Sequence, residues 1–187
     1  LSGHKGAGDV FVAEADEYVT DPGHDATPRF LWQKPDVLIV TNIDYDHPDM
    51  YPDLSSVQDA FVALQKQSKV TIVMADDEAS SVLRDNDNVV TFGFSKKLKE
   101  LELQVPGRHN LLNAAAAIAA SERIGISWEI IKRGLLRFGG TKRRFEKLGE
   151  VHGALIYDDY AHHPKEIEST IAAFRDTYPN KRLIVVF

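Results

Sequence analysis

The sequence contains no cysteine, so the chain can form neither a disulfide nor a thiolate metal site, and any metal must be held by histidine, aspartate or glutamate. It also lacks an apolar run near the roughly 20 residues that span a bilayer. Basic residues are not in excess, because 22 lysines and arginines stand against 28 aspartates and glutamates. This balance argues against non-specific nucleic-acid binding. No basic-then-apolar leader follows Leu1. We therefore expect a cytoplasmic protein that binds neither nucleic acid nor membranes.

The composition is that of an ordinary folded domain, with 43% hydrophobic and 27% charged residues. A chain of 187 residues can form one sizeable domain, or one domain and part of another. It opens in a glycine-rich loop and stops in the apolar run RLIVVF at 182–187. We therefore expect a piece of a longer polypeptide.

Short apolar runs alternate with helical patterns, which predicts β–α units and a mostly parallel sheet. The predicted buried strands are residues 10–13, 37–41, 70–75, 155–157 and 183–187. Two further runs, at 91–94 and 101–105, predict a smaller antiparallel patch whose strands are joined by the charged loop SKKLKE.

Helical patterns follow several of these strands. One helix, between the second and third strands, is predicted to be capped by Ser55 or Ser56. Another, alanine-rich, covers 110–124, Ser127 begins the next, and Pro164 begins the last. The predicted fold class is α/β: a doubly wound, mostly parallel sheet with a small antiparallel patch, then the first βαβ unit of a Rossmann-like domain.

The polar, glycine-flanked stretch GGTKRRFEKLGE at 139–150 is the best candidate for a connection between domains. We accordingly predict a nucleotide-binding domain over 1–147 and the beginning of a second domain over 148–187.

Acidic clusters follow two predicted strands, EADE at 14–17 and TNIDYDHPD at 41–49. Ligands in open α/β sheets bind beyond the carboxyl ends of the strands, so Glu14 and His47 could meet there on a divalent ion. Solvated turn residues would give the same pattern, and Mg²⁺ prefers oxygen ligands. Both interpretations stay open on spacing alone.

Two further motifs suit a nucleotide but have ordinary explanations. Asn110 and Asn113 are three residues apart and share a helix face, where their amides suit an adenine edge. Taken alone, the pattern favours the ordinary explanation, in which Asn110 caps the helix and Asn113 has no special role. The arginines of TKRRFE at 141–146 suit a transferring phosphate or could merely be solvated.

The heptad DDYAHHP at 158–164 contains four side chains of metal-binding type within six positions. Adjacent residues of an extended loop point in different directions, so His162 and His163 do not easily share one ion. The heptad alone is therefore a poor metal site.

Five motifs occur in the order found in Mur ligases: EADE, TNIDYDHPD, VPGRHNLLNAAAAIA, FGGTKRRFE and DDYAHHPKEI. This resemblance runs from Phe11 to Phe187 and outweighs the ordinary explanation of each motif alone. It implies a three-domain, ATP-dependent ligase, of which the chain resembles most of the central domain, the hinge and the start of the third domain. The implied reaction joins L-alanine to UDP-N-acetylmuramate through an acyl phosphate in peptidoglycan precursor synthesis. The DDYAHHP form also occurs in ligases that recycle murein tripeptide.

The resemblance implies roles for single residues on the nucleotide side. Glu14 and His47 resemble catalytic ligands of Mg²⁺ or Mn²⁺. Asn110 resembles the residue that contacts the adenine of ATP, with His109 and Asn113 nearby.

Other roles fall on the hinge and the DDYAHHP loop. Arg144 resembles the catalytic hinge arginine that reaches the γ-phosphate, and Asp159 resembles the ribose contact. Tyr160, His162 and His163 lie where the family's third domain faces its acceptor substrates.

Some features depart from the family pattern. The 187 residues contain no G-x-x-x-x-G-K-[ST] loop, and GHKGAG at 3–8 does not replace it. We therefore expect the isolated chain to be inactive. The link after EADE is longer than usual, which leaves the partners of Glu17 and Asp21 open, and SKKLKE is shorter than expected.

Two alternatives from other classes remain. A metal-dependent phosphohydrolase would use Glu14, Asp46 and His47 and need no amino acid. A non-catalytic nucleotide-binding module would bind adenine nucleotide weakly and turn nothing over.

Overall fold

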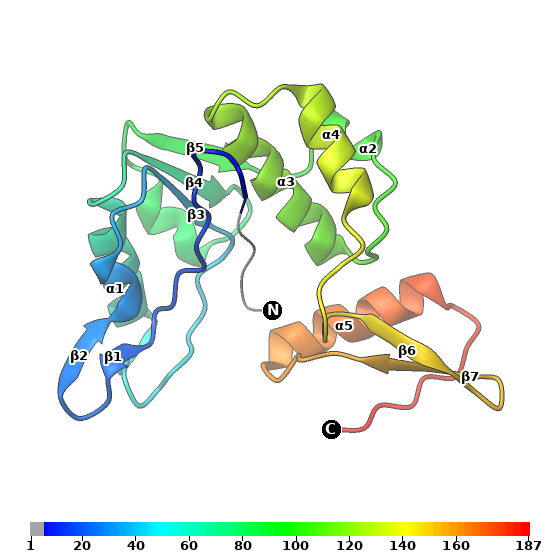
Figure 1. Cartoon of the computed structure of the whole chain (residues 1–187). Coiled ribbons are helices and arrows are strands. Elements are labelled where there is room, and N and C mark those ends of the chain that lie inside the picture. Colours follow the sequence, from blue (N-terminus) through cyan, green and yellow to red (C-terminus); the bar gives the residue numbers. More distant parts are fainter. Residues whose placement is uncertain (1–5) are drawn as a thin grey trace.

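The computed structural model describes residues 6–187 and shows two lobes (Figure 1). The first, the sheet lobe, comprises residues 6–138 and contains a parallel sheet with helices on both faces. The second, the C-terminal lobe, comprises residues 146–187 and consists of a β-hairpin beside one helix. Residues 139–145, the hinge segment, connect them. Within the described range, no helix has the length and apolar character needed to cross a membrane.

Three parallel strands form the centre of the sheet lobe: β3 (Val37–Val40), β4 (Val70–Met74) and β5 (Val89–Phe92). They lie in the order β3–β4–β5. Their β-branched residues suit a pleated surface that is covered on both faces. The predicted strands at 37–41 and 70–75 are confirmed.

The two faces of the sheet are covered by different helices. Along β4, Val70 and Ile72 pack with α3 (Arg108–Arg123), whereas Val73 packs with α1 (Leu54–Gln65). This alternation follows from the period of two in a strand. The doubly covered, mostly parallel α/β sheet is thus confirmed.

Helix α1 begins differently from the prediction. Its N-cap is Asp53, whose Oδ1 accepts a 2.8 Å hydrogen bond from the backbone N–H of Ser56. Ser56 returns a bond to the Asp53 backbone, which completes a capping box. The prediction of Ser55 or Ser56 as the cap is wrong, because Asp53 takes the extended conformation before the helix.

The helices predicted at 110–124 and after Ser127 are confirmed, but α3 begins at Arg108 after the N-cap Gly107, so Asn110 is not its cap. The prediction of SKKLKE as a loop is wrong in part, because Lys96–Lys99 form the short helix α2. Helix α3 is followed by Gly125 in the left-handed conformation, with φ of +81°. Helix α4 (Trp128–Arg137) begins after Ser127. The short elements are β1 (Val19–Asp21), β2 (Asp25–Pro28), the 3-10 helices η1 (Arg29–Trp32) and η2 (Ala79–Leu83), and α2 (Lys96–Lys99) within the predicted loop SKKLKE.

Some predicted strands of the sheet lobe are wrong. Residues 10–13 pair with no strand in the described part of the chain, and Phe11 is 91% exposed. Residues 101–105 form no strand, and Leu101 instead packs in the core beside α3. The run at 91–94 overlaps β5, which is parallel to β4. Antiparallel pairing occurs instead in the hairpins β1–β2 and β6–β7.

The C-terminal lobe is a hairpin of β6 (Glu146–Val151) and β7 (Ala154–Asp158), followed by α5 (Pro164–Thr177). The turn consists of His152 and Gly153, both with positive φ, as a tight hairpin turn requires. The strand predicted at 155–157 and the helix predicted from Pro164 are confirmed.

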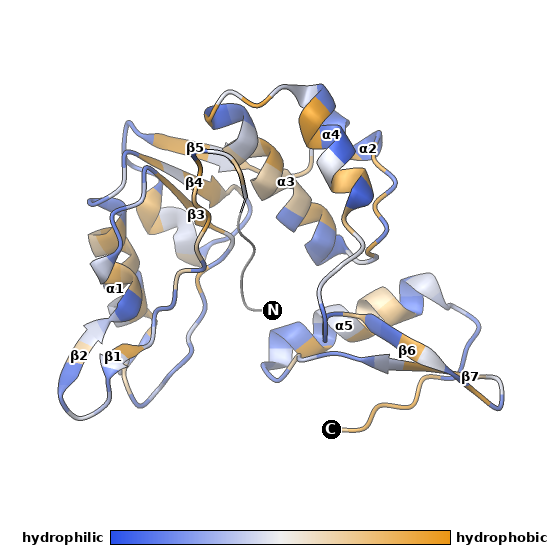
Figure 2. Ribbon diagram, in the orientation of Figure 1, coloured by the Kyte–Doolittle hydropathy of each residue, from blue (hydrophilic) through white to orange (hydrophobic). Residues whose placement is uncertain are grey.

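Two expectations for this lobe need correction. The predicted connection at 139–150 is shorter, because β6 already begins at Glu146 and runs across the proposed domain limit at residue 147. Residues 183–187 form no strand and remain largely exposed, so the second strand of the predicted βαβ unit is not formed. Figure 2 shows this tail as an apolar trace beside the hairpin.

Candidate functional site

A cleft of about 1360 Å³ lies between the lobes. The sheet lobe contributes the segments after β3 and the first turns of α3, and the C-terminal lobe contributes the loop after β7 and the first turns of α5. Eight of the ten predicted site residues line it: Glu14, His109, Asn110, Asn113, Arg144, Asp159, His162 and His163. His47 and Tyr160 are not among the lining residues.

The start of α3 approaches α5 at a glycine. Gly107 has φ of +100°, and a Cβ there would lie 2.7 Å from Cε1 of His109 and 3.0 Å from Cβ of Ala173. Glycine is therefore required both by the backbone conformation and by the contact between the helices. It allows the His109 ring to lie against the junction of the lobes.

His109 is held in its neutral form. Burial lowers the pKa of its imidazole, Asp159 opposes this, and Arg144 lowers the pKa further, so the net shift is downward. At neutral pH the ring therefore carries one donor and one acceptor.

The side chain of Asn110 is already oriented. Its Nδ2 donates a 2.6 Å hydrogen bond to the backbone oxygen of Pro106. The carboxamide oxygen and the second N–H stay available, which is the donor–acceptor pair that an adenine edge needs. Asn113 lines the same cleft one helical turn later.

Arg144 sits in an unusual stretch of backbone. Its neighbours Arg143 and Phe145 both have positive φ, +56° and +53°. Such conformations are strained outside glycine and persist where surrounding contacts hold them. The contacts come from the loop after β7: Tyr160 N–H donates to the Arg143 carbonyl at 2.8 Å, and Phe145 N–H donates to Oδ2 of Asp159 at 2.8 Å.

Asp159 connects three segments. Besides Phe145, it accepts a 2.8 Å bond from Ala161 N–H and a 3.3 Å bond from Oγ1 of Thr170, both on Oδ1. A carboxylate offers about four lone-pair positions, so one remains for a ligand hydroxyl. Asp159 can thus hold the hinge segment and still contact a ribose.

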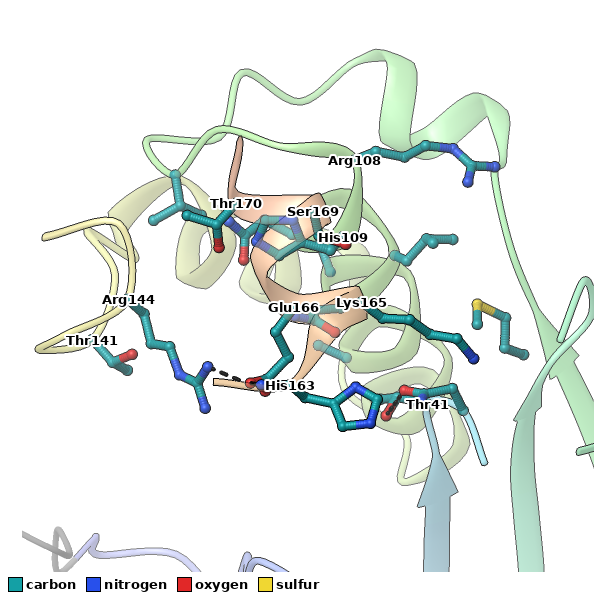
Figure 3. Close-up of a pocket in the computed structure, with 18 of the residues that line it drawn as sticks. Thr41, Arg108, His109, Thr141, Arg144, His163, Lys165, Glu166, Ser169 and Thr170 are labelled. Atoms are coloured by element: carbon teal, nitrogen blue, oxygen red, sulfur yellow. Dashed lines mark hydrogen bonds and ion pairs between the residues drawn. The ribbon is translucent and has the colours of Figure 1, made fainter. Parts of the chain in front are cut away.

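Glu166, which the sequence interpretation missed, is the partner of Arg144. Its Oε1 lies 3.5 Å from a guanidinium nitrogen of Arg144, as Figure 3 shows. Its Oε2 accepts the backbone N–H groups of His162 and His163 at 3.2 and 3.3 Å. Burial raises the pKa of Glu166, but these two bonds and Arg144 and His162 outweigh it and lower the pKa overall. A glutamate three residues into a helix is a recognisable capping signal.

Tyr160 does not line the cleft, and two guanidinium groups lie over its ring. The guanidinium carbons of Arg143 and Arg144 lie 4.7 and 5.7 Å from the ring centroid. Nδ1 of His162 lies 3.0 Å from the Tyr160 carbonyl oxygen. Tyr160 therefore supports the hinge arginines in this arrangement.

The turn after β3 gathers a candidate metal site. Ligand atoms of Glu17, Asp46 and His47 all lie within 4.8 Å of one another. Nε2 of His47 is 3.4 Å from a Glu17 oxygen and 3.9 Å from an Asp46 oxygen. Adjacent ligands of a small octahedral cation are about 3 Å apart, so a slight contraction would accommodate Mg²⁺ or Mn²⁺. Glu17 and Asp46 line the cleft between the lobes, as Glu14 does, but Glu14 is not in this group.

The backbone and aromatic rings around this group hold it in place. His47 has φ of +55°, and its carbonyl accepts the N–H groups of Met50 and Tyr51. The Tyr51 hydroxyl donates to the Glu17 carbonyl at 2.7 Å, and the Tyr18 ring lies 4.8 Å from the imidazole. Burial, with Glu17 and Asp16, raises the pKa of Tyr51 to about 12, so this phenol remains a donor.

Sequence reasoning singled out the acidic clusters but not every member that matters. Glu17 belongs to EADE, yet its partners remained open. Asp46 precedes His47 directly and figured only in the phosphohydrolase alternative. The available signal was an acidic residue beside a histidine at the end of a strand. That Glu17 lies close to Asp46 and His47 could be seen only in the folded structure.

Two domain families match this sequence. The Mur ligase middle domain matches residues 6–102, and the Mur ligase glutamate ligase domain matches residues 143–187.

Relatives and solved structures agree with these matches. The UDP-N-acetylmuramate–L-alanine ligase of Desulfitobacterium hafniense (strain Y51) is 35% identical over 98% of this chain and 45% of its own length. That of Nitratidesulfovibrio vulgaris (strain DP4) is 38% identical over 97% and 45%. The crystal structure of UDP-N-acetylmuramate–alanine ligase from Thermotoga maritima has a TM-score of 0.66 at 27% identity and covers 81% of this chain and 40% of that one. The chain thus spans less than half the length of the curated relatives it matches.

Proposed function

Because this chain belongs to the Mur ligase family, we propose that it forms the nucleotide-binding lobe and hinge of a ligase joining L-alanine to UDP-N-acetylmuramate. Two relatives of that name align with nearly the whole chain. The observation that carries the proposal is that one cleft is lined by residues of all five motifs, from both lobes.

The proposed reaction has two steps. The carboxylate of UDP-N-acetylmuramate attacks the γ-phosphorus of ATP, an O–P bond forms, and ADP leaves. The amine of L-alanine then attacks the carbonyl carbon of the acyl phosphate, a C–N bond forms, the C–O bond breaks, and phosphate leaves as the amine loses a proton. Both steps concentrate negative charge, so the site must supply cations and donors where that charge develops.

The residues of this chain can divide that work. Asn110 and Asn113 would bind adenine, and the free position of Asp159 would bind the ribose. Arg144 is half-exposed and only 3.5 Å from Glu166, so its guanidinium can exchange that carboxylate for phosphoryl oxygens. His163, which also lines the cleft, would face the acceptor substrate, with His162 beside it and Tyr160 behind the arginines.

A divalent cation would be held by Glu17, Asp46 and His47, with Glu14 nearby in the cleft. Such an ion, Mg²⁺ or Mn²⁺, supplies charge neutralisation to phosphoryl oxygens when bound. The mixed nitrogen and carboxylate donors fit either ion. The division into 1–147 and 148–187 is part of the same proposal.

The experiment uses the full-length protein with ATP, UDP-N-acetylmuramate and L-alanine. We expect phosphate release that requires both the UDP-sugar and the amino acid. Release from ATP that needs neither, or hydrolysis of simple phosphoesters, would instead support the phosphohydrolase alternative.

Arg144→Ala should lower kcat by roughly 100-fold or more, because one charged donor to the transferring group is lost. Binding of the UDP-sugar, measured by calorimetry, should stay unchanged. The control is Arg137→Ala, which removes an arginine at the end of α4 that is not itself among the residues lining the cleft. Unchanged turnover in Arg144→Ala would contradict the role assigned to Arg144.

A further inference from the structure

One ion pair spans the cleft from lobe to lobe. Nζ of Lys165 lies 2.7 Å from Oδ2 of Asp44. Lys165 is the second residue of α5, and Asp44 belongs to the turn after β3. Both line the cleft. Figure 3 shows the Lys165 side chain extending from α5 toward the side of the cleft where Thr41 lies.

The two partners are prepared differently for this contact. Asp44 is largely shielded, with 26% of its side chain exposed, and its other oxygen accepts the Tyr45 N–H at 3.0 Å. Its carboxylate is therefore oriented by its own turn. Lys165 is 70% exposed and reaches across on a flexible chain. The sheet lobe thus contributes an oriented carboxylate, and the C-terminal lobe contributes an ammonium group on a flexible side chain.

Helix α5 touches the sheet lobe at a second place. Ala173 packs against the start of α3, where a Cβ on Gly107 would lie 3.0 Å away. Ala173 and Lys165 are eight residues apart, which is about 12 Å along a helix. The contact at Ala173 and the ion pair of Lys165 thus hold α5 against the sheet lobe at two separate points.

The pair also adjoins both halves of the candidate site in sequence. Asp44 lies two residues before Asp46 of the Glu17–Asp46–His47 group, and Lys165 directly precedes Glu166, the partner of Arg144. Holding Lys165 on Asp44 therefore sets the separation between that group and Arg144.

We propose that Lys165 and Asp44 are positioning residues that form an electrostatic latch across the cleft, holding α5 closed against the turn after β3. The latch itself depends only on this structure, whereas its effect on catalysis rests on the proposed function. A partly exposed ion pair such as this one shifts an equilibrium by about two- to fivefold. That is weak enough for the cleft to open in each cycle for substrates and products.

The first test measures the closure directly in this chain. Because the sequence has no cysteine, Asp59→Cys on α1 and Asp176→Cys on α5, both exposed, accept two spin labels uniquely. The distribution of distances between the two labels is measured by pulsed electron–electron double resonance. Lys165→Glu and Asp44→Lys should each reduce the closed population two- to fivefold, and the double exchange should restore it. Salt at 1 M should likewise reduce the closed population of the unsubstituted protein, because it screens exposed charges.

Controls separate the latch from general effects. Lys181→Glu removes the same charge from the same lobe outside the cleft lining and should leave the distribution unchanged. Lys165→Met removes the charge and keeps the length, which provides a second variant if a charge reversal fails to fold. An unchanged distribution in folded Lys165→Met, or a double exchange that does not restore closure, would overturn the proposal.

The second test measures the catalytic consequence in the full-length protein. Lys165→Met should raise KM for ATP two- to fivefold with a smaller change in kcat, and the double exchange should recover KM. If the distance distribution depends on Lys165 and Asp44 as expected while the full-length protein shows no ligase activity, the latch is supported and the proposed function is contradicted. If the ligase is active and its distance distribution is insensitive to both residues, the latch falls and the function stands.

Discussion

In the sheet lobe, side chains are buried on both faces of the sheet, in one cluster around Ile72 and α3 and another around Val73 and α1. In residues 139–187, all of which the structure describes, Ala173 alone is buried, at 1% exposure, and its contact is with the sheet lobe. The first lobe therefore has cores of its own. The second has one buried side chain, and that side chain packs against the sheet lobe.

The contacts that hold the C-terminal lobe together are aromatic. Phe145 stacks on Phe174 with ring centroids 4.0 Å apart, and Tyr157 meets Phe174 edge to face at 4.9 Å. Tyr157 also forms a hydroxyl pair with Tyr178. Phe145 belongs to the hinge segment, so the internal contacts of this lobe and the geometry around Arg144 are coupled. So few buried side chains are typical of a region with low local stability.

The largest expected effect comes from the same deletion made in each lobe. Ile72→Ala removes a side chain with 0% exposure and should lower the free energy of unfolding by about 2–5 kcal/mol. Ile156→Ala removes a side chain that is 40% exposed in β7 and should cost less than about 1 kcal/mol. Urea denaturation followed by circular dichroism gives both values. Equal losses would contradict the contrast between the lobes.

The next effect concerns the junction. Gly107→Ala should cost about 1–3 kcal/mol, because alanine is strained at φ of +100° and its Cβ would press on His109 and Ala173. Gly134→Ala is the matched control in α4, where nothing lies within 4 Å of the new Cβ. There the helix should gain up to about 1 kcal/mol. The two melting temperatures should therefore move in opposite directions; a shift of the same sign would refute the special role of Gly107.

The smallest effect is the pH dependence of Glu166. Its pKa in the folded chain is lowered from the ordinary 4.5, so its contribution to stability is present above pH 4.5 and is lost as the pH falls through the lowered value. Glu166→Gln should remove this contribution and flatten the stability profile between pH 6 and 3. Glu168→Gln, exposed on the same helix, is the control. Profiles that coincide for Glu166→Gln and the parent would contradict this assignment.

Elements with a strong local pattern were predictable from the sequence. Helix α3 carries its alanines and its terminal glycine, and α5 begins with proline, so both are specified within a few residues. The apolar runs at 10–13, 101–105 and 183–187 resemble strands equally well. Whether a run becomes a strand depends on a neighbour that can pair its backbone groups, and that neighbour is not encoded in the run.

In the candidate site, too, some residues were predictable from the sequence and others were not. Eight of the ten predicted residues line one cleft. They come from the segment before β1, the first turns of α3, the hinge segment and the loop after β7, so their gathering depends on how the two lobes meet rather than on the parallel sheet alone. The partners were not predictable. Glu166 faces Arg144 from 22 residues away, and Tyr51 holds the Glu17 backbone from 34 residues away.

By itself, the sequence determined the α/β class, most helices, the motif order and the residue types available for nucleotide chemistry, since these depend on local periodicity, caps and composition. Only the tertiary structure decided that Glu17 joins Asp46 and His47, that Asp159 fastens the hinge segment, and that Lys165 meets Asp44 across the cleft. These contacts join residues up to 121 positions apart, and their geometry is set by packing and by backbone pairing, which act through space rather than along the chain.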